Sequence, residues 1–137
     1  MYKQAKSLKN KLNMTPGKFI GVLFHSRDTM HIAHLQTTSF AEHKALNNYY
    51  DNVLDLTDKF TEAYMGRYGR PKMTASTGKL QIYDVNDKRA PQLMKEAIRW
   101  LTKSLPKQLS KDDTDLLNIR DEILGDIQQA RYLFTLH

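Results

Sequence analysis

The sequence predicts an all-α protein, a four-helix bundle with a long connection between its second and third helices. Two observations support this fold class. Apolar residues recur every three to four positions in four stretches, the pattern of helices that bury one face. Capping residues, glycines and prolines separate these stretches. At 137 residues, of which 40% are hydrophobic, the chain is long enough to bury a single core.

The first helix is predicted over residues 16–36. Thr15 and Pro16 form a typical helix start, because a Thr side chain can cap the first turn and Pro fits its first position. The residues that share its apolar face are Phe19, Ile20, Leu23, Met30 and His34. We expect residues 1–14 to form a basic tail and residues 15–137 to form one bundle domain.

The second helix is predicted over residues 40–65. Ser39 and Glu42 have the spacing of a capping box, in which each side chain bonds to the other's backbone N–H. Gly66 ends the helical pattern. The apolar positions that keep a helical period are Leu46, Tyr50, Val53, Leu54, Thr57, Phe60 and Tyr64.

Residues 67–86 are the least helical part of the chain, and 80–83 alternate in the manner of a short extended segment, which cannot form a sheet alone. The third helix is predicted over residues 88–105, where Pro106 stops it. Ser110, Asp112 and Asp113 are expected to cap the fourth helix. The apolar stripe of that helix is Leu116, Ile119, Ile123, Ile127, Ala130 and Phe134.

The composition narrows the possible functions. The chain has no cysteine, so a metal site would have to use His and carboxylate side chains. No apolar run is long enough for a membrane span, and the N-terminus has no apolar segment of the kind that secretory signals contain. We therefore expect no membrane partner and a cytoplasmic location.

The net charge of +6 is concentrated in patches, the first of which is the N-terminal tail. Flexible lysines can bind DNA through its phosphates without reading its sequence. The alternative is a solvated tail that only keeps the protein in solution. Residues 1–18 hold no acid and contain Lys3, Lys6, Lys9, Lys11 and Lys18.

Polar residues border the apolar face of the second helix in one stripe, formed by His43, Asn47, Asp51, Asp58 and Glu62. On the first helix, His31 and His34 lie one turn apart, His34 near the centre of the apolar face and His31 toward one side. Asp58 and Glu62 lie roughly 22–28 Å from the histidines at a rise of about 1.5 Å per residue. One metal ion can therefore be reached by both groups only if a second subunit supplies the carboxylates.

The arrangement of His31, His43, Asp58 and Glu62 resembles the ferroxidase centre of the Dps family, the DNA-protecting mini-ferritins. Phe40 and Gly66 match further positions of that family, and the resemblance covers residues 30–66 best. It implies a ferritin-like bundle and a homo-oligomer. It also implies a site for iron or another divalent metal, with two histidines from one subunit and an Asp and a Glu from its mate. The spacing of the Dps family favours His31 as the first ligand, whereas helical geometry favours His34. Both therefore stay candidates.

The sequence departs from the Dps pattern at three positions. Ile32 replaces a tryptophan, Asn47 replaces an aspartate and Ala63 replaces an arginine. A neutral amide in place of a charged ligand lowers the affinity for metal. Three sequence segments are similar to segments of a family of uncharacterised small bacteriophage proteins: SFAEHKAL at 39–46, EAYMG at 62–66 and NIRDEIL at 118–124.

Two functions follow as hypotheses. The first is a Dps-like, iron-binding oligomer with possible ferroxidase activity, with His31, His34, His43, Asp58 and Glu62 as candidate ligands. The second is a non-catalytic helical module that binds a protein or nucleic acid. In the second case the polar stripe fixes helix pairing, and arginines pair with its carboxylates. The arginines near the apolar faces are Arg27, Arg120 and Arg131.

Overall fold

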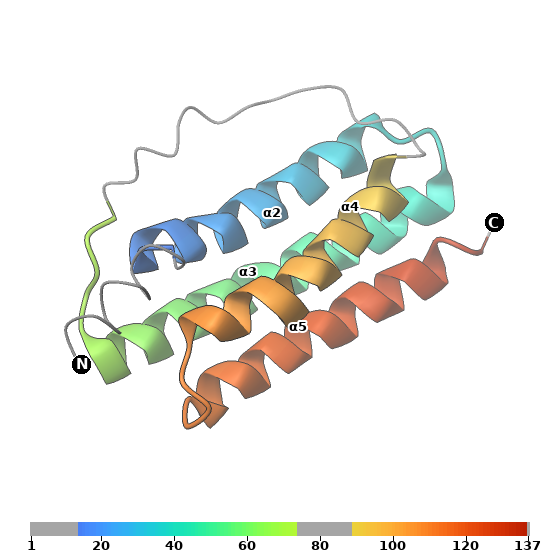
Figure 1. Cartoon of the computed structure of the whole chain (residues 1–137). Coiled ribbons are helices and arrows are strands. Elements are labelled where there is room, and N and C mark those ends of the chain that lie inside the picture. The colour runs from blue at the N-terminus through green and yellow to red at the C-terminus, as the bar shows by residue number, and fades with distance from the viewer. Residues whose placement is uncertain (1–13, 74–88, 137) are drawn as a thin grey trace.

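The computed structural model describes residues 14–73 and 89–136, and within them the protein is helical, without a strand. Four α-helices build the fold (Figure 1): α2 (Pro16–Gln36), α3 (Phe40–Tyr68), α4 (Arg89–Arg99) and α5 (Thr114–Leu133). After α4 the chain continues through a π-helical turn, Trp100–Ser104, and a 3-10 turn, Leu105–Gln108. The all-α prediction is confirmed.

The longest helix, α3, packs against α2 on one side and α5 on the other, while α2 and α4 touch only over a short stretch. Figure 1 shows that α3 runs antiparallel to both of its main neighbours and parallel to α4. A parallel pair of helices needs a connection that returns along the bundle. The predicted long connection therefore joins α3 to α4, and its residues 74–88, including the segment 80–83, lie outside the described residues, as does most of the predicted tail.

The helix ends follow local chemistry with two corrections. The capping box is confirmed in part, since the Ser39 hydroxyl accepts a hydrogen bond from the Glu42 backbone N–H at 3.2 Å. Thr15 occupies the cap position of α2, but its side chain makes no capping bond. Gly66 does not end α3, because a glycine inside a helix costs only about 1 kcal/mol. The helix ends at Gly69, whose φ of 85° is a left-handed conformation that favours glycine.

The predicted apolar stripes form the core, with two departures, of which the first is Phe134, only partly buried and packed against the core. Leu54 was expected inside, but 39% of its surface is exposed on the outer side of α3. Among the described residues, no helix combines the length and the hydropathy that a membrane span requires. The largest fully buried apolar side chains are Phe19, Ile20, Met30, Leu46, Phe60, Met94, Leu105, Leu116, Ile123 and Ile127.

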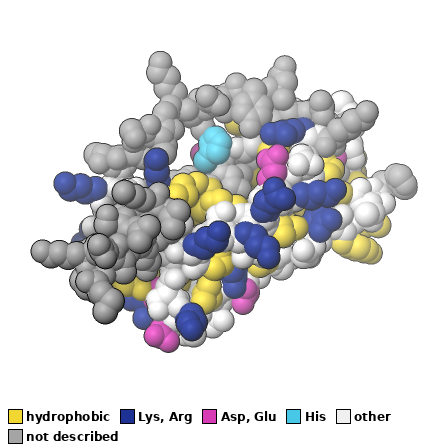
Figure 2. Space-filling view, viewed as in Figure 1, with side chains coloured by type: hydrophobic (Ala, Val, Ile, Leu, Met, Phe, Trp, Pro, Cys, Tyr) yellow, Lys and Arg dark blue, Asp and Glu magenta, His cyan; other side chains and the backbone are white. Residues whose placement is uncertain are grey.

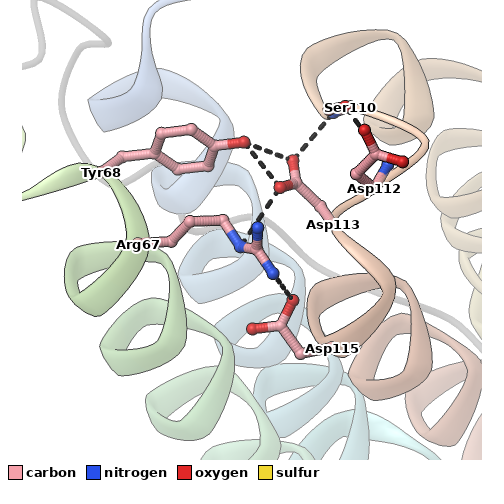
Figure 3. A network of polar contacts seen from close by, with 6 residues as sticks. All are labelled: Arg67, Tyr68, Ser110, Asp112, Asp113 and Asp115. Atoms are coloured by element: carbon pink, nitrogen blue, oxygen red, sulfur yellow. Dashed lines mark hydrogen bonds and ion pairs between the residues drawn. The ribbon is translucent and has the colours of Figure 1, made fainter.

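A buried carboxylate joins the end of α3 to the start of α5 (Figure 3). Asp113 is 1% exposed and accepts hydrogen bonds from the Tyr68 hydroxyl at 2.6 Å and from the Ser110 backbone N–H at 2.8 Å. Arg67 lies 3.3 Å from the same carboxylate and 2.8 Å from Asp115. The hydrogen bond to Asp113, together with burial, raises the pKa of Tyr68 to about 12.

This network corrects the predicted cap of α5. Asp113 does stand at the cap position, but its side chain makes no capping hydrogen bond to the helix. The carboxylate turns away from the first turn toward Tyr68 and Arg67. A buried charge is stable only when it is hydrogen-bonded or paired, and the α3 terminus supplies both kinds of partner.

Replacing Asp113 with Ala should lower the free energy of unfolding by about 2–3 kcal/mol, because Ser110 loses its acceptor and α3 loses its link to α5. Chemical denaturation measures this difference. The matched control is Asp112→Ala at the neighbouring exposed position, which should change stability by no more than about 0.5 kcal/mol. Equal stability of the two variants would contradict the structural role of Asp113.

Candidate functional site

A pocket of about 280 Å³ lies between α2 and α4 and reaches down to α3 and α5. It exists because α2 and α4 touch only briefly, so the space between them is not filled by interlocking side chains. The wall is mainly apolar, and its lining includes Leu23, Met30, Val53, Leu93 and Trp100. Trp100 is the single tryptophan of the chain and is half-buried.

A few polar groups interrupt this apolar wall. The ring of Tyr49 is 2% exposed, and burial raises the pKa of its hydroxyl. The hydroxyl of Thr29 is satisfied by the His25 carbonyl oxygen at 2.8 Å. His25 and Glu96 are exposed and belong to the pocket lining from α2 and α4. The sequence did not predict His25 as a pocket residue, because the α2–α4 pairing is not visible in the sequence.

The α4 side of the pocket carries charges of both signs. Glu96 lines the pocket and forms an ion pair with Arg89 at 3.6 Å. Arg99 ends α4 directly before the lining residue Trp100, Lys103 lies in the π-helical turn that follows, and both cations are exposed. Figure 2 shows Lys and Arg side chains gathered on the face that carries α4, with hydrophobic side chains exposed between them. We call the pocket together with Arg99 and Lys103 the groove.

The π-helical turn places Trp100 in the pocket wall. Such turns are rare and frequently occur at functional sites. The carbonyl oxygen of Leu101 in this turn accepts a hydrogen bond from Arg120 of α5 at 3.1 Å. A bond from a neighbouring helix satisfies a backbone group in the widened turn, so α5 helps to hold the turn in place.

A second cluster of polar residues lies where the short α2–α3 connection brings the two helix ends together. The rings of His34 and His43 stack at 4.0 Å, and the His31 ring stacks on Tyr50, also at 4.0 Å. His43 Nδ1 lies 2.9 Å from the His34 carbonyl oxygen. His34 is 7% exposed, and its Nδ1 has no hydrogen-bond partner within the described part of the chain. We call these three histidines the histidine cluster.

Burial is the main cause that lowers the pKa of His34 below 6.5, and the neighbouring His43 and His31 act in the same direction. Asp51 opposes this shift, but less strongly. His34 is therefore neutral at pH 7. A neutral imidazole can act as a hydrogen-bond donor, an acceptor or a metal ligand.

The structure brings three of the five predicted metal ligands together and leaves the other two apart. Asp58 and Glu62 are exposed several turns along α3 from the histidine cluster, as the helical rise predicted. The lone pairs of an imidazole lie in the ring plane, and stacked rings such as His34 and His43 do not aim them at one point. Within residues 14–73 and 89–136, no three His, Asp or Glu side chains are grouped to hold a metal ion. The shared site between two subunits stays a prediction, because a single chain does not test it.

The three arginines proposed as partners of the polar stripe bind elsewhere. Arg27 donates to the Tyr50 carbonyl oxygen at 3.1 Å. Besides Leu101, Arg120 bonds to the adjacent Asp121, and Arg131 bonds to Gln128. Since the Tyr50 and Leu101 carbonyl oxygens belong to other helical segments than the arginines that bind them, wheel positions alone did not identify these contacts.

The outer face of α3 carries a row of carboxylates that we call the acidic ridge, formed by Asp51, Asp55, Asp58 and Glu62. All four are exposed and lie at intervals of three or four residues on one side of the helix. None of them takes part in an ion pair with another described residue. The exposed Leu54 lies at the edge of the same row.

The low pKa of His34 predicts a pH-dependent stability. The unfolded chain takes up a proton at His34 at a higher pH than the folded chain does, so the free energy of unfolding should fall as the pH drops below about 6.5. Denaturation curves measured from pH 7.5 to pH 5 check this. In His34→Leu this fall should be weaker than in the original chain, whereas the exposed control His25→Leu should keep it. An unchanged pH dependence in His34→Leu would contradict the assignment.

Comparison with known proteins gives a family and one relative. The model of a family of unknown function, DUF5856, matches residues 34–134. An uncharacterized 14.6 kDa protein in the mobD-ri intergenic region of Enterobacteria phage T4 is 31% identical over 122 residues, 87% of each chain. The predicted similarity to small bacteriophage proteins is thereby confirmed, whereas these matches lend no support to the Dps resemblance. No solved structure matches the chain, so the ferritin-like assignment of the bundle stays a prediction.

Proposed function

The chain belongs to the DUF5856 family, and we propose that it is a non-catalytic interaction module that binds a protein partner in the groove between α2 and α4. The observation that carries this proposal is the mainly apolar pocket, together with the exposed cations Arg99 and Lys103 that follow its α4 lining along the chain. Concave apolar sites with a few polar groups are the usual places where proteins bind ligands or anchoring side chains.

The size of the pocket favours a side chain over a cofactor. Small-molecule sites commonly measure roughly 300–1,000 Å³. At about 280 Å³, this pocket is just below that range and suits one or two bulky apolar side chains. In protein interfaces a few such buried anchors supply most of the binding energy.

The positive charges of Arg99 and Lys103 favour a partner segment that has acidic residues around the apolar side chain that enters the pocket. Arg99 and Lys103 are exposed, one turn apart and free to meet carboxylates. An acidic segment with a bulky apolar residue therefore fits both parts of the groove. A nucleic acid would use the cations through its phosphates but leave the apolar wall without a role, so a protein partner is favoured.

Trp100 offers a direct test because it lines the pocket and is the only tryptophan. Short tryptophan-free peptides should be titrated that are identical except for a central Leu, Phe or Ala among glutamates. The Leu and Phe peptides should shift the Trp100 emission to shorter wavelength and saturate. The Ala peptide should bind at least about tenfold more weakly, because it has no anchor.

Two variants locate the binding. Ala97→Phe fills the pocket from α4 and should abolish the emission shift, and Arg99→Glu should weaken binding by about tenfold. The matched control is Arg131→Glu, which changes the net charge equally at an exposed site of α5. If no acidic peptide alters the emission while double-stranded DNA does, the protein-binding proposal is wrong and a nucleic-acid module replaces it.

A second candidate function is metal binding by the histidine cluster, with Asp58 and Glu62 supplied by another subunit, as the Dps resemblance implies. One observation favours it: the buried Nδ1 of His34 has no hydrogen-bond partner among the described residues, and such atoms usually have one. Iron or another divalent metal suits imidazole and carboxylate ligands. The stacked rings would have to turn before they could bind it.

Metal analysis of the purified protein tests this candidate. The original chain should retain metal after dialysis, and both His43→Ala and Asp58→Ala should lose it, while the control Asp55→Ala retains it. Because the site is shared, metal should also be confined to an oligomeric fraction. Equal metal content in all four proteins would exclude the site.

A further inference from the structure

The groove and the acidic ridge are complementary, and we infer that the partner which enters the groove is the acidic ridge of a second copy of this chain. The inference rests on the proposed function and names its partner. It also gives the ridge a role that the contacts within one chain do not provide.

The ridge has the two properties that the groove requires. Its four carboxylates are exposed and unpaired among the described residues, so they are available to cations of another molecule. Leu54 is a bulky apolar side chain, 39% exposed, with Asp51, Asp55 and Asp58 nearby on the same helix. An exposed leucine beside carboxylates is the combination that a mainly apolar pocket beside exposed cations accommodates.

The spacing of the charges also matches. The ridge presents about one carboxylate per turn of α3, and the groove presents two cations four residues apart, Arg99 at the end of α4 and Lys103 in the π-helical turn that follows. At a rise of about 1.5 Å per residue, carboxylates four residues apart on α3 are separated by roughly 6 Å along the helix axis. Two neighbouring carboxylates can therefore face the two cations of the groove.

The geometry favours a head-to-tail contact over a two-fold pair of α3 helices. Two ridges facing each other would place carboxylates of both copies side by side, which is unfavourable without added cations. The groove belongs to α2 and α4, whereas the ridge lies on α3 behind them in the view of Figure 1. Each copy therefore offers both surfaces at once, and repeated contacts build a ring or a filament.

Charge reversal tests this contact in the full chain. A groove variant, Arg99→Glu with Lys103→Glu, has an acidic groove and an acidic ridge. A ridge variant, Asp51→Lys with Asp55→Lys and Asp58→Lys, has a basic groove and a mainly basic ridge. In sedimentation measurements at low salt, the original chain should assemble with rising concentration and dissociate with added salt. Each variant alone should stay monomeric, and their equal mixture should assemble again.

Two further variants separate this contact from general attraction between charged proteins. Lys111→Glu with Arg131→Glu changes the net charge as much as the groove variant does, but at exposed sites outside the groove, and should assemble like the original chain. Leu54→Ala leaves the charge unchanged and should weaken assembly by about tenfold, because the anchor is lost.

The outcomes distinguish this inference from the proposed function. If the chain stays monomeric while acidic peptides still shift the Trp100 emission, the self-docking is wrong and the groove binds another protein. If the chain assembles but the groove variant and Leu54→Ala assemble equally well, the contact lies elsewhere and the inference is wrong. If neither assembly nor peptide binding occurs, both are wrong.

Discussion

The buried carboxylate of Asp113 ties the end of α3 to the start of α5. It is nearly inaccessible to solvent, and a charge in that position requires partners, which it finds in the last turn of α3 and in the backbone before α5. Ser110 belongs to the turn before α5, so the same carboxylate also ties this turn to the end of α3.

The groove is the consequence of unequal packing. The long helix α3 has neighbours on two sides, and its contacts with α2 and α5 dominate the structure. The α4 segment is short and ends in a π-helical turn, which Arg120 of α5 supports through the Leu101 carbonyl oxygen. Its contact with α2 is brief, so space remains beside Trp100. Charge is also separated, with carboxylates along the outer side of α3 and cations along α4.

The histidine cluster has a different origin. A short connection after α2 forces the ends of α2 and α3 together, and the rings of His34 and His43 stack as a result. No comparable constraint brings Asp58 or Glu62 nearer, because α3 is a continuous helix. Both candidate functions therefore depend on how copies or partners meet the surface of one bundle.

The helical pattern was readable from the residues alone, because burial of one helix face imposes its period on the sequence. It predicted the extents of α2 and α3 closely, the capping bond of Ser39 to Glu42, and the distance between the histidines and Asp58. Local rules were weaker where a distant partner competes. These rules predicted that α3 ends at Gly66, but the helix continues to Tyr68. They also predicted Asp113 as a cap of α5, but Tyr68 and Arg67 draw its carboxylate away from the helix.

The candidate sites also differ in how far the sequence predicts them. The three histidines and the two carboxylates could be identified from residue type and spacing, which are both properties of the sequence. The groove could not, because His25 on α2 is far in the sequence from Glu96 and Trp100, and their meeting depends on which helix faces pack. The sequence alone thus specified the helices and their buried faces through local periodicity. The groove and the placement of Asp113 arose only in the folded bundle, because contacts between distant helices carry no local signal.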